Sequence, residues 1–213
     1  MPTLTWDDEV NAALTPVLAA LDALDIRYYI GGSLASSLWG EARSTNDADI
    51  VAALRPEHVD PLYALLRPQY YVDQDTMRDA VRRHDCFNLI DPARFYKIDI
   101  FRVQALDPFE VSALARAVPF ENTATGGVIL FPTPEDVILQ KLRWWRKGGN
   151  RGPEVVAEAD RSQRQWHDVR GVAKAQAADL DWAYLREYAQ GLELTADLAR
   201  LEREVTPPPP EAP

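Results

Sequence analysis

The stretch GGSLASSLWGEARSTNDADI, residues 31–50, decides how this chain folds. Two glycines and a serine stand before a short helical run, and Asp47 and Asp49 then lead into the apolar run Ile50–Leu54. This order predicts a helix over about 33–39 and a buried strand that begins at Asp49. Carboxylates at the head of a buried strand are costly unless something offsets their charge. We therefore expect a cation beside them.

The flanking sequence predicts a mixture of helices and strands. Apolar residues at helical spacing predict helices over 7–24, 57–66 and 76–83, and β-rich runs predict strands over 27–30, 70–72, 86–90, 96–103 and 128–131. Thr133 and Pro134 form a helix start, and three more helices are expected over 153–176, 181–190 and 195–204. This order predicts an α/β (α+β) fold, with a small mixed β-sheet core flanked by helices and followed by a C-terminal helical bundle. We expect domains over 1–131 and 132–205 and a disordered proline-rich tail over 206–213.

Composition narrows the class of protein. The 213 residues are 46% hydrophobic and carry a formal net charge of −10, which argues against a nucleic-acid binder that uses its whole surface. The segment from Lys141 to Lys174 contains nine Lys or Arg and four Asp or Glu. Its formal net charge is therefore +5, and that of the remainder of the chain is −15. The single cysteine, Cys86, the acidic start MPTLTWDDEV and the lack of a long apolar run predict a reduced, cytoplasmic protein with no membrane partner.

A third carboxylate lies on a predicted strand. Residues two apart on a strand point to the same side, so Asp47 and Asp49 can converge, and Asp99 shares a face with Lys97 and Phe101 on the later strand. Carboxylates about 4 Å apart would repel by roughly 4 kcal/mol per pair at an effective dielectric constant near 20. Either some protonate or a cation joins them, and Mg²⁺ prefers such hard oxygen ligands.

The glycine-rich turn suits a phosphate. Gly31 and Gly32 let the backbone approach closely, and the N-terminus of the following helix offers N–H groups and a positive dipole end. Ser33 can cap that helix or donate its hydroxyl to a phosphate oxygen. Together with the aspartates, this pattern indicates a site for a nucleoside triphosphate with metal. The alternative for the glycines is a plain strand-to-helix turn.

The pattern of Gly-Gly-Ser, thirteen residues, Asp-Ala-Asp-Ile and a later strand aspartate resembles the nucleotidyltransferase superfamily related to DNA polymerase beta. The run Arg43-Ser44-Thr45-Asn46-Asp47-Ala48-Asp49 is similar to the Arg-x-Thr-x-Asp-x-Asp form of its minimal bacterial members. The resemblance implies that residues 1–131 form the catalytic domain. It also implies that Asp47, Asp49 and Asp99 hold two Mg²⁺ ions, or Mn²⁺, and act as catalytic residues. Arg43 would neutralise phosphate charge.

The run PTPEDVILQKLRWWR resembles a helix of the AbiEii-type toxin nucleotidyltransferases and their uncharacterised relatives, which carry a lysine there and an aspartate further on. The resemblance assigns Lys141 to nucleotide binding, with its amine directed into a cleft between the domains, and it assigns Asp168 to the same site. Alternatively, the Lys141 stem packs on Trp145, and Asp168 is a solvated helix acid or an arginine partner.

The function implied is a transferase that moves a nucleoside monophosphate from ATP or another nucleoside triphosphate to an acceptor hydroxyl and releases pyrophosphate. The acceptor would be RNA, such as tRNA, a partner protein or a small molecule, and a toxin–antitoxin role is one possibility. Two alternatives stay open. One is an idle nucleotidyltransferase-like binding module, such as an antitoxin or scaffold, and the other is a glycosyltransferase that uses Asp-x-Asp.

Overall fold

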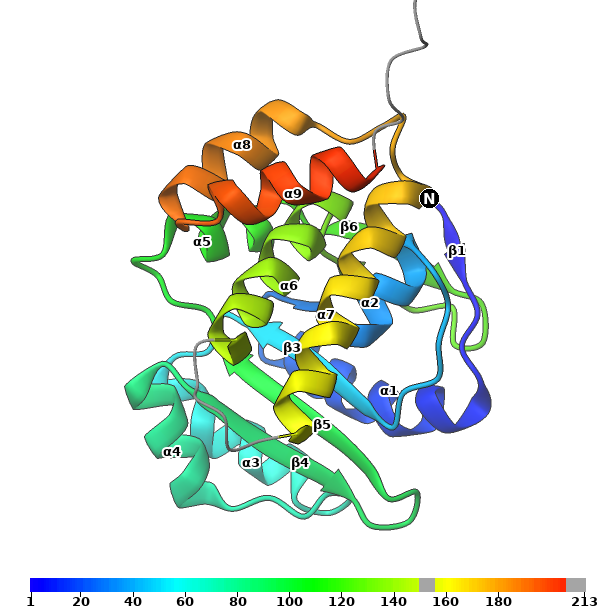
Figure 1. The fold of residues 1–213 in the computed structure, drawn as a ribbon. Helices are drawn as coiled ribbons and strands as arrows, with labels where there is room; N and C mark the ends of the chain where they lie inside the picture. Colours follow the sequence, from blue (N-terminus) through cyan, green and yellow to red (C-terminus); the bar gives the residue numbers. More distant parts are fainter. Residues whose placement is uncertain (150–155, 206–213) are drawn as a thin grey trace, which may run out of the picture. The chain divides into compact units, whose positions relative to one another are not determined.

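The computed structural model describes residues 1–149 and 156–205, and the chain divides into two compact units. Unit 1 comprises residues 1–34 and 44–132, and unit 2 comprises residues 35–43 and 133–213. The chain therefore passes from one unit to the other three times. The first crossing lies inside helix α2 (Gly32–Trp39), which begins in unit 1 and ends in unit 2 (Figure 1).

Unit 1 is built on a four-stranded sheet with the strand order β2-β3-β5-β4. The central strands β3 (Asp47–Ala52) and β5 (Tyr96–Arg102) run parallel, and the outer strands β2 (Tyr28–Ile30) and β4 (Cys86–Asp91) are antiparallel to their neighbours. Ile50, Ile98 and Ile100 are fully buried, whereas Lys97, Asp99 and Phe101, which alternate with the isoleucines along β5, are more exposed. Only one face of β5 is therefore part of the apolar core.

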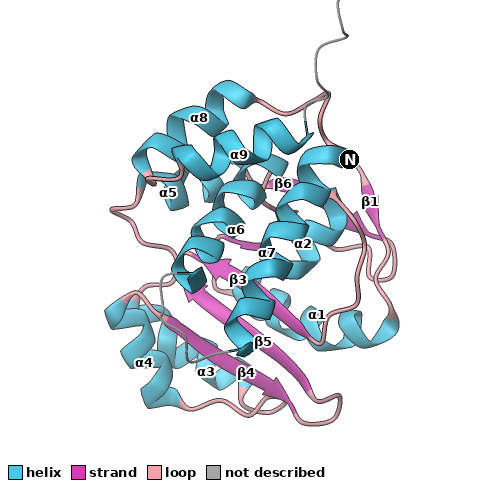
Figure 2. Ribbon diagram, viewed as in Figure 1, coloured by secondary structure: helices cyan, strands magenta, loops and turns pink. Residues whose placement is uncertain are grey.

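A second, three-stranded sheet completes unit 1 (Figure 2), with the order β1-β6-β7. Strand β6 (Val118–Asn122) pairs parallel with the short β1 (Thr3–Leu4) and antiparallel with β7 (Val128–Phe131). Phe131 is fully buried and makes edge-to-face contacts with Trp6 and Phe120. Aromatic packing therefore supports this small sheet.

Three helices of unit 1 begin at capping aspartates. Asp7 accepts a hydrogen bond from the Val10 N–H at 2.8 Å, Asp73 caps the fourth helix and Asp107 the fifth. The apolar stripe expected on the first helix is buried. The bounds are α1 (Asp8–Ala23), the 3₁₀ turn η1 (Pro56–His58), α3 (Val59–Leu66), α4 (Gln74–Arg83) and α5 (Pro108–Arg116).

Unit 2 is helical in its described part. Helices α6 (Pro134–Gly149), α7 (Val156–Ala175), α8 (Trp182–Gly191) and α9 (Thr195–Val205) pack on one another. The Thr133 hydroxyl accepts from the Asp136 N–H at 3.4 Å, which confirms the predicted helix start. Gly40, just after α2, lies so close to α7 that an added Cβ would be 2.7 Å from the Val172 nitrogen.

The expected mixed α/β fold is confirmed, and so are most of the predicted elements. The strand expected over 70–72 is wrong, because only an isolated bridge joins Tyr71 to Ile90. β1, α5 and β6 were not expected. The GGNRG break and the proline-rich tail fall wholly or partly on residues 150–155 and 206–213, outside the described residues. No helix within the described residues is long and apolar enough to cross a bilayer.

Candidate nucleotide and metal site

The strand register brings the three predicted carboxylates onto one face of unit 1. Asp49 on β3 lies directly opposite Asp99 on β5, and Asp47 lies opposite Lys97. Because residues two apart on a strand share a face, all four side chains project from the same side of the sheet. The opposite side carries the buried isoleucines of β3 and β5. Asp99 is thus beside Asp49, where the sequence motif places it.

The glycine turn lies against Asp49. The Gly31 N–H donates to the Asp49 carbonyl oxygen at 2.8 Å. Gly32 has a φ of +56°, and a Cβ added to it would stand 1.7 Å from Asp49 Oδ2. Only glycine therefore leaves room for this carboxylate next to the first turn of α2. Ser33 follows in that turn and is partly exposed.

Asp99 contacts two side chains that the sequence motif does not include. Lys97 Nζ lies 2.8 Å from Asp99 Oδ2, and the Asn88 amide on β4 donates to Asp99 Oδ1. Partial burial lowers the pKa of Lys97, but the hydrogen bond and the charge of Asp99 outweigh this effect and raise it. Lys97 is therefore a charged ammonium at neutral pH.

Asp47 is held at the start of β3 by its neighbours. The Thr45 hydroxyl donates to its carboxylate, and the Tyr96 hydroxyl donates to its carbonyl oxygen at 3.2 Å. Burial, and after it the charge of Asp47, raises the pKa of Tyr96. Tyr96 is therefore a neutral donor at neutral pH, and it fixes the backbone that carries Asp47.

The donor set suits a divalent cation of the Mg²⁺ or Mn²⁺ type. Asp47, Asp49 and Asp99 offer hard carboxylate oxygens on one face, and the missing Cβ of Gly32 leaves the space that Asp49 occupies. In the described part of the chain, no three His, Cys, Asp or Glu side chains stand close enough to hold a metal ion as they lie. The carboxylates would have to turn from their present hydrogen-bond partners to share an ion.

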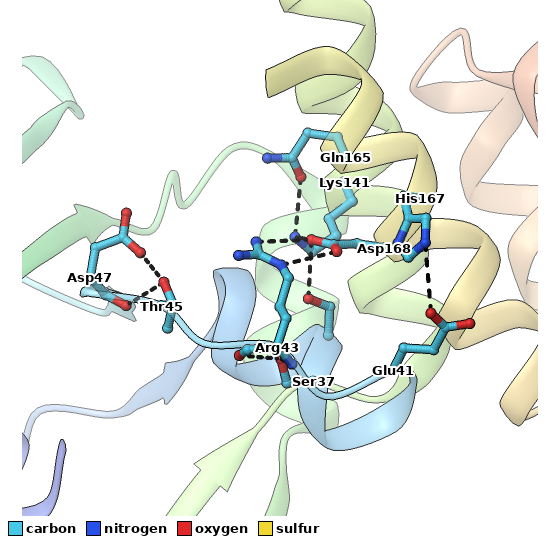
Figure 3. A network of polar contacts seen from close by, with 10 residues as sticks. Ser37, Glu41, Arg43, Thr45, Asp47, Lys141, Gln165, His167 and Asp168 are labelled. Carbon is cyan, nitrogen blue, oxygen red and sulfur yellow. Dashed lines mark hydrogen bonds and ion pairs between the residues drawn. The ribbon is translucent and has the colours of Figure 1, made fainter. Parts of the chain in front are cut away.

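The other predicted residues, Arg43, Lys141 and Asp168, meet within unit 2 (Figure 3). Asp168 on α7 accepts from Arg43 through Nε and Nη2, both at 3.2 Å. Lys141 Nζ on α6 lies 2.7 Å from Asp168 Oδ2 and also donates to Gln165 at 3.1 Å. The Ser36 hydroxyl on α2 completes the cluster at 3.3 Å from Asp168.

In this cluster two cationic side chains, Arg43 and Lys141, share the carboxylate of Asp168. The side chains of Lys141 and Asp168 are only 2% and 5% exposed. Burial raises the pKa of Asp168, but the charges and hydrogen bonds of Lys141 and Arg43 outweigh it, so the pKa lies below the usual 3.8. Asp168 is therefore an arginine and lysine partner and not a solvated acid. Lys141 contacts these groups rather than only packing its stem on Trp145.

Asn88, Ser36 and Gln165 were missed by sequence reasoning. A signal for Asn88 existed, because the hairpin of β4 and β5 sets Asn88 opposite Asp99 once its four-residue turn, 92–95, is counted. Ser36 and Gln165 had no such signal, since their roles depend on how α2, α6 and α7 pack. Lys97 was expected on the Asp99 face, but its ion pair was not expected.

Neither a protein-family model nor a curated protein sequence matches this chain significantly. Among solved structures, the chain is similar to an antigenic nucleotidyltransferase-like protein from Paracoccidioides brasiliensis, with a TM-score of 0.60 and 18% identity over 93% of this chain and 89% of that one. It is also similar to the antibiotic-resistance factor ANT(2'')-Ia, with a TM-score of 0.51 and 15% identity over 93% of this chain and 98% of that one. At these identities the likeness concerns the fold, which is nucleotidyltransferase-like.

Proposed function

We propose that this protein transfers a nucleoside monophosphate from a nucleoside triphosphate to an acceptor hydroxyl. The observation that carries the proposal is the register of Asp49 with Asp99 beside Gly32, on a nucleotidyltransferase-like fold. Asp47, Asp49 and Asp99 would hold two Mg²⁺ or Mn²⁺ ions. When bound, these ions would acidify the acceptor hydroxyl and offset the charge of the triphosphate.

The reaction forms one bond and breaks one. The acceptor oxygen bonds to the α-phosphorus, the bond from that phosphorus to the bridging oxygen of the β-phosphate breaks, and pyrophosphate leaves. Asp99 would accept the hydroxyl proton or hold the acceptor in line. Gly31, Gly32 and Ser33 would bind phosphate oxygens through the N-terminus of α2.

Arg43 and Lys141 are proposed as further triphosphate ligands. Support comes from the meeting of these two cationic side chains at Asp168, since cations attract the negative charge of a phosphate. The likeness to AbiEii-type toxins rests on the Lys141 motif alone. A small-molecule acceptor has separate support, because one structural neighbour is an antibiotic-resistance factor. A cytoplasmic location, which the single cysteine favours, would supply the nucleotides.

The test is label transfer from each of the four α-labelled nucleoside triphosphates, with Mg²⁺, to tRNA, protein extract and a panel of small hydroxyl compounds. We expect one acceptor class to become labelled with release of pyrophosphate, and Asp49→Asn to abolish the labelling. Asp75→Asn is the matched control, because Asp75 is 90% exposed on α4 and its loss removes the same charge from unit 1.

Three outcomes would contradict the proposal. Transfer that survives in Asp49→Asn would place the chemistry elsewhere. Nucleotide binding without transfer to any acceptor would instead favour an idle binding module, and turnover of nucleotide sugars would favour a glycosyltransferase.

A further inference from the structure

Lys97 lies between two of the proposed metal ligands. It is opposite Asp47 across the β3–β5 pair and two residues before Asp99 on its own strand. Its ammonium is 2.8 Å from Asp99 Oδ2, and its side chain is 50% exposed while that of Asp99 is 14% exposed. A cation is thus already present at one of the three carboxylates, at a distance typical of a charge-assisted hydrogen bond.

No second cation shares this position within the sheet. The face is formed by alternate residues of the fully described strands β3, β4 and β5, and among these residues Lys97 is the only Lys or Arg. Arg102, at the end of β5, belongs to the opposite alternation and donates to the Leu54 carbonyl at 2.9 Å. The carboxylate repulsion on this face is therefore offset, within these strands, by Lys97 alone.

Both oxygens of Asp99 already have a partner. Oδ2 pairs with Lys97 and Oδ1 accepts from Asn88. A divalent cation that takes an oxygen of Asp99 must displace one of these groups or share the oxygen with it. Of the two, the ammonium also repels the ion, whereas the neutral Asn88 amide does not.

We infer that Lys97 is an internal counter-cation of Asp99, which stabilises the carboxylate face without metal and competes with a divalent ion for Asp99. This inference rests on the proposed function, because it takes Asp47, Asp49 and Asp99 as metal ligands. Lys97 is a positioning residue. It keeps metal affinity at Asp99 low until bound substrate contributes further negative charge.

The test is a titration of Mn²⁺ alone into the full-length protein, with free Mn²⁺ measured by electron paramagnetic resonance. Lys97→Gln is expected to bind Mn²⁺ about fivefold tighter or more, from one unit charge removed at close range. Lys97→Arg retains the charge and should bind as the wild type does. Lys174→Gln is the matched control, since it removes a lysine charge from an exposed position on α7 in unit 2.

A second measurement follows the wild-type protein, and a variant serves only to assign its resonances. Carbon-13 resonances of the Lys97 side chain, assigned with Lys97→Arg, should shift as Mg²⁺ fills the site, since the ammonium leaves Asp99. The chain has only four lysines, which makes this assignment practical.

The two failures can be told apart. If Asp99→Asn weakens Mn²⁺ binding but Lys97→Gln binds like the wild type or more weakly, the counter-cation role is wrong and the metal site stands. Lys97 resonances that stay unchanged as Mg²⁺ binds would overturn the role as well. If neither Asp49→Asn nor Asp99→Asn alters Mn²⁺ binding, the proposed metal site is wrong and the inference falls with it.

Discussion

At Gly32, the Asp49 carboxylate occupies the space that a side chain at this position would need. We expect Gly32→Ala to lower transfer activity about 100-fold, because the new methyl group would displace Asp49 from its position. The positive φ of +56° adds a backbone cost, so the free energy of unfolding should fall by about 1–3 kcal/mol. Label transfer and urea unfolding measure the two effects.

Gly191→Ala is the control for this change, because nothing lies within 4 Å of a Cβ added there. It should keep wild-type activity and stability. If Gly32→Ala also kept full activity, Asp49 could not be a catalytic ligand in its present position.

Asp168 stabilises unit 2 by a buried contact with two cations. We expect Asp168→Asn to lower the free energy of unfolding by about 3–5 kcal/mol at pH 7, since Arg43 and Lys141 would lose the negative charge of Asp168. Urea unfolding measures the loss, with exposed Asp179→Asn as the control in the same unit.

The wild type and Asp168→Asn differ in their free energy of unfolding, and the pH dependence of this difference follows from the lowered pKa of Asp168. A carboxyl whose folded pKa lies below its unfolded value stabilises the protein above the unfolded pKa, near 3.8. That contribution disappears as the pH falls from 3.8 through the lower folded value. The gap between wild type and Asp168→Asn should therefore narrow under acid conditions. A gap that widens there would contradict the ion-pair assignment.

At the scale of elements, the end of α2 depends on close packing against α7. A Cβ on Gly40 would lie 2.7 Å from the Val172 nitrogen and 2.9 Å from the Gly171 carbonyl carbon, both of which are backbone atoms that cannot turn away. We expect Gly40→Ala to lower the free energy of unfolding by about 1–3 kcal/mol through overpacking. Thermal unfolding beside Gly191→Ala tests this, and equal midpoints would show that α7 can shift to accommodate the methyl group.

The elements also show what a sequence can predict here. The long helices and β7 follow from their apolar spacing and from Thr133–Pro134, because local chemistry specifies them. β6 was missed because Pro119 weakens a strand pattern. Yet the short β1 pairs only with Glu121 and Asn122, so Pro119 lies where β6 has a neighbour on one side. Helix α5 did have a signal in Asp107 and Pro108.

Tyr70–Val72 has strand-forming residues but forms only the bridge from Tyr71 to Ile90. The candidate site also has residues that the sequence predicts and residues that it does not. The aspartates and glycines carry a spacing that can be recognised in sequence, whereas Asn88 and the Asp168 cluster depend on pairing and helix packing between distant segments. Local residues cannot specify such contacts.

For the whole molecule, ligand binding should raise the free energy of unfolding. Mg²⁺ with a non-hydrolysable ATP analogue at about 100 times its dissociation constant should stabilise the folded protein by about 2.7 kcal/mol, because the ligand binds only the native state. Calorimetry measures this as a rise in the unfolding midpoint. Asp49→Asn should lose most of the rise and Asp75→Asn should keep it. An equal rise in both variants would show that nucleotide binding does not depend on Asp49.

The charge of the molecule bears on the acceptor. Unit 1, which carries the three aspartates, has ten Lys or Arg and eighteen Asp or Glu, a net charge of −8. Any polyanionic acceptor is repelled by this unit and would need basic residues such as those between Lys141 and Lys174. An RNA acceptor would thus bind with a strong dependence on salt.

The route of the chain through α2 bears on how the protein can be divided. Residues 35–43 belong with 133–213, although more than 80 residues separate them in the sequence. A gene fragment that begins at codon 133 would lack the segment that packs on Gly171 and Val172, while the upstream fragment would carry it without its counterpart. Recombination at this boundary should therefore be selected against, and we expect both regions to be inherited together.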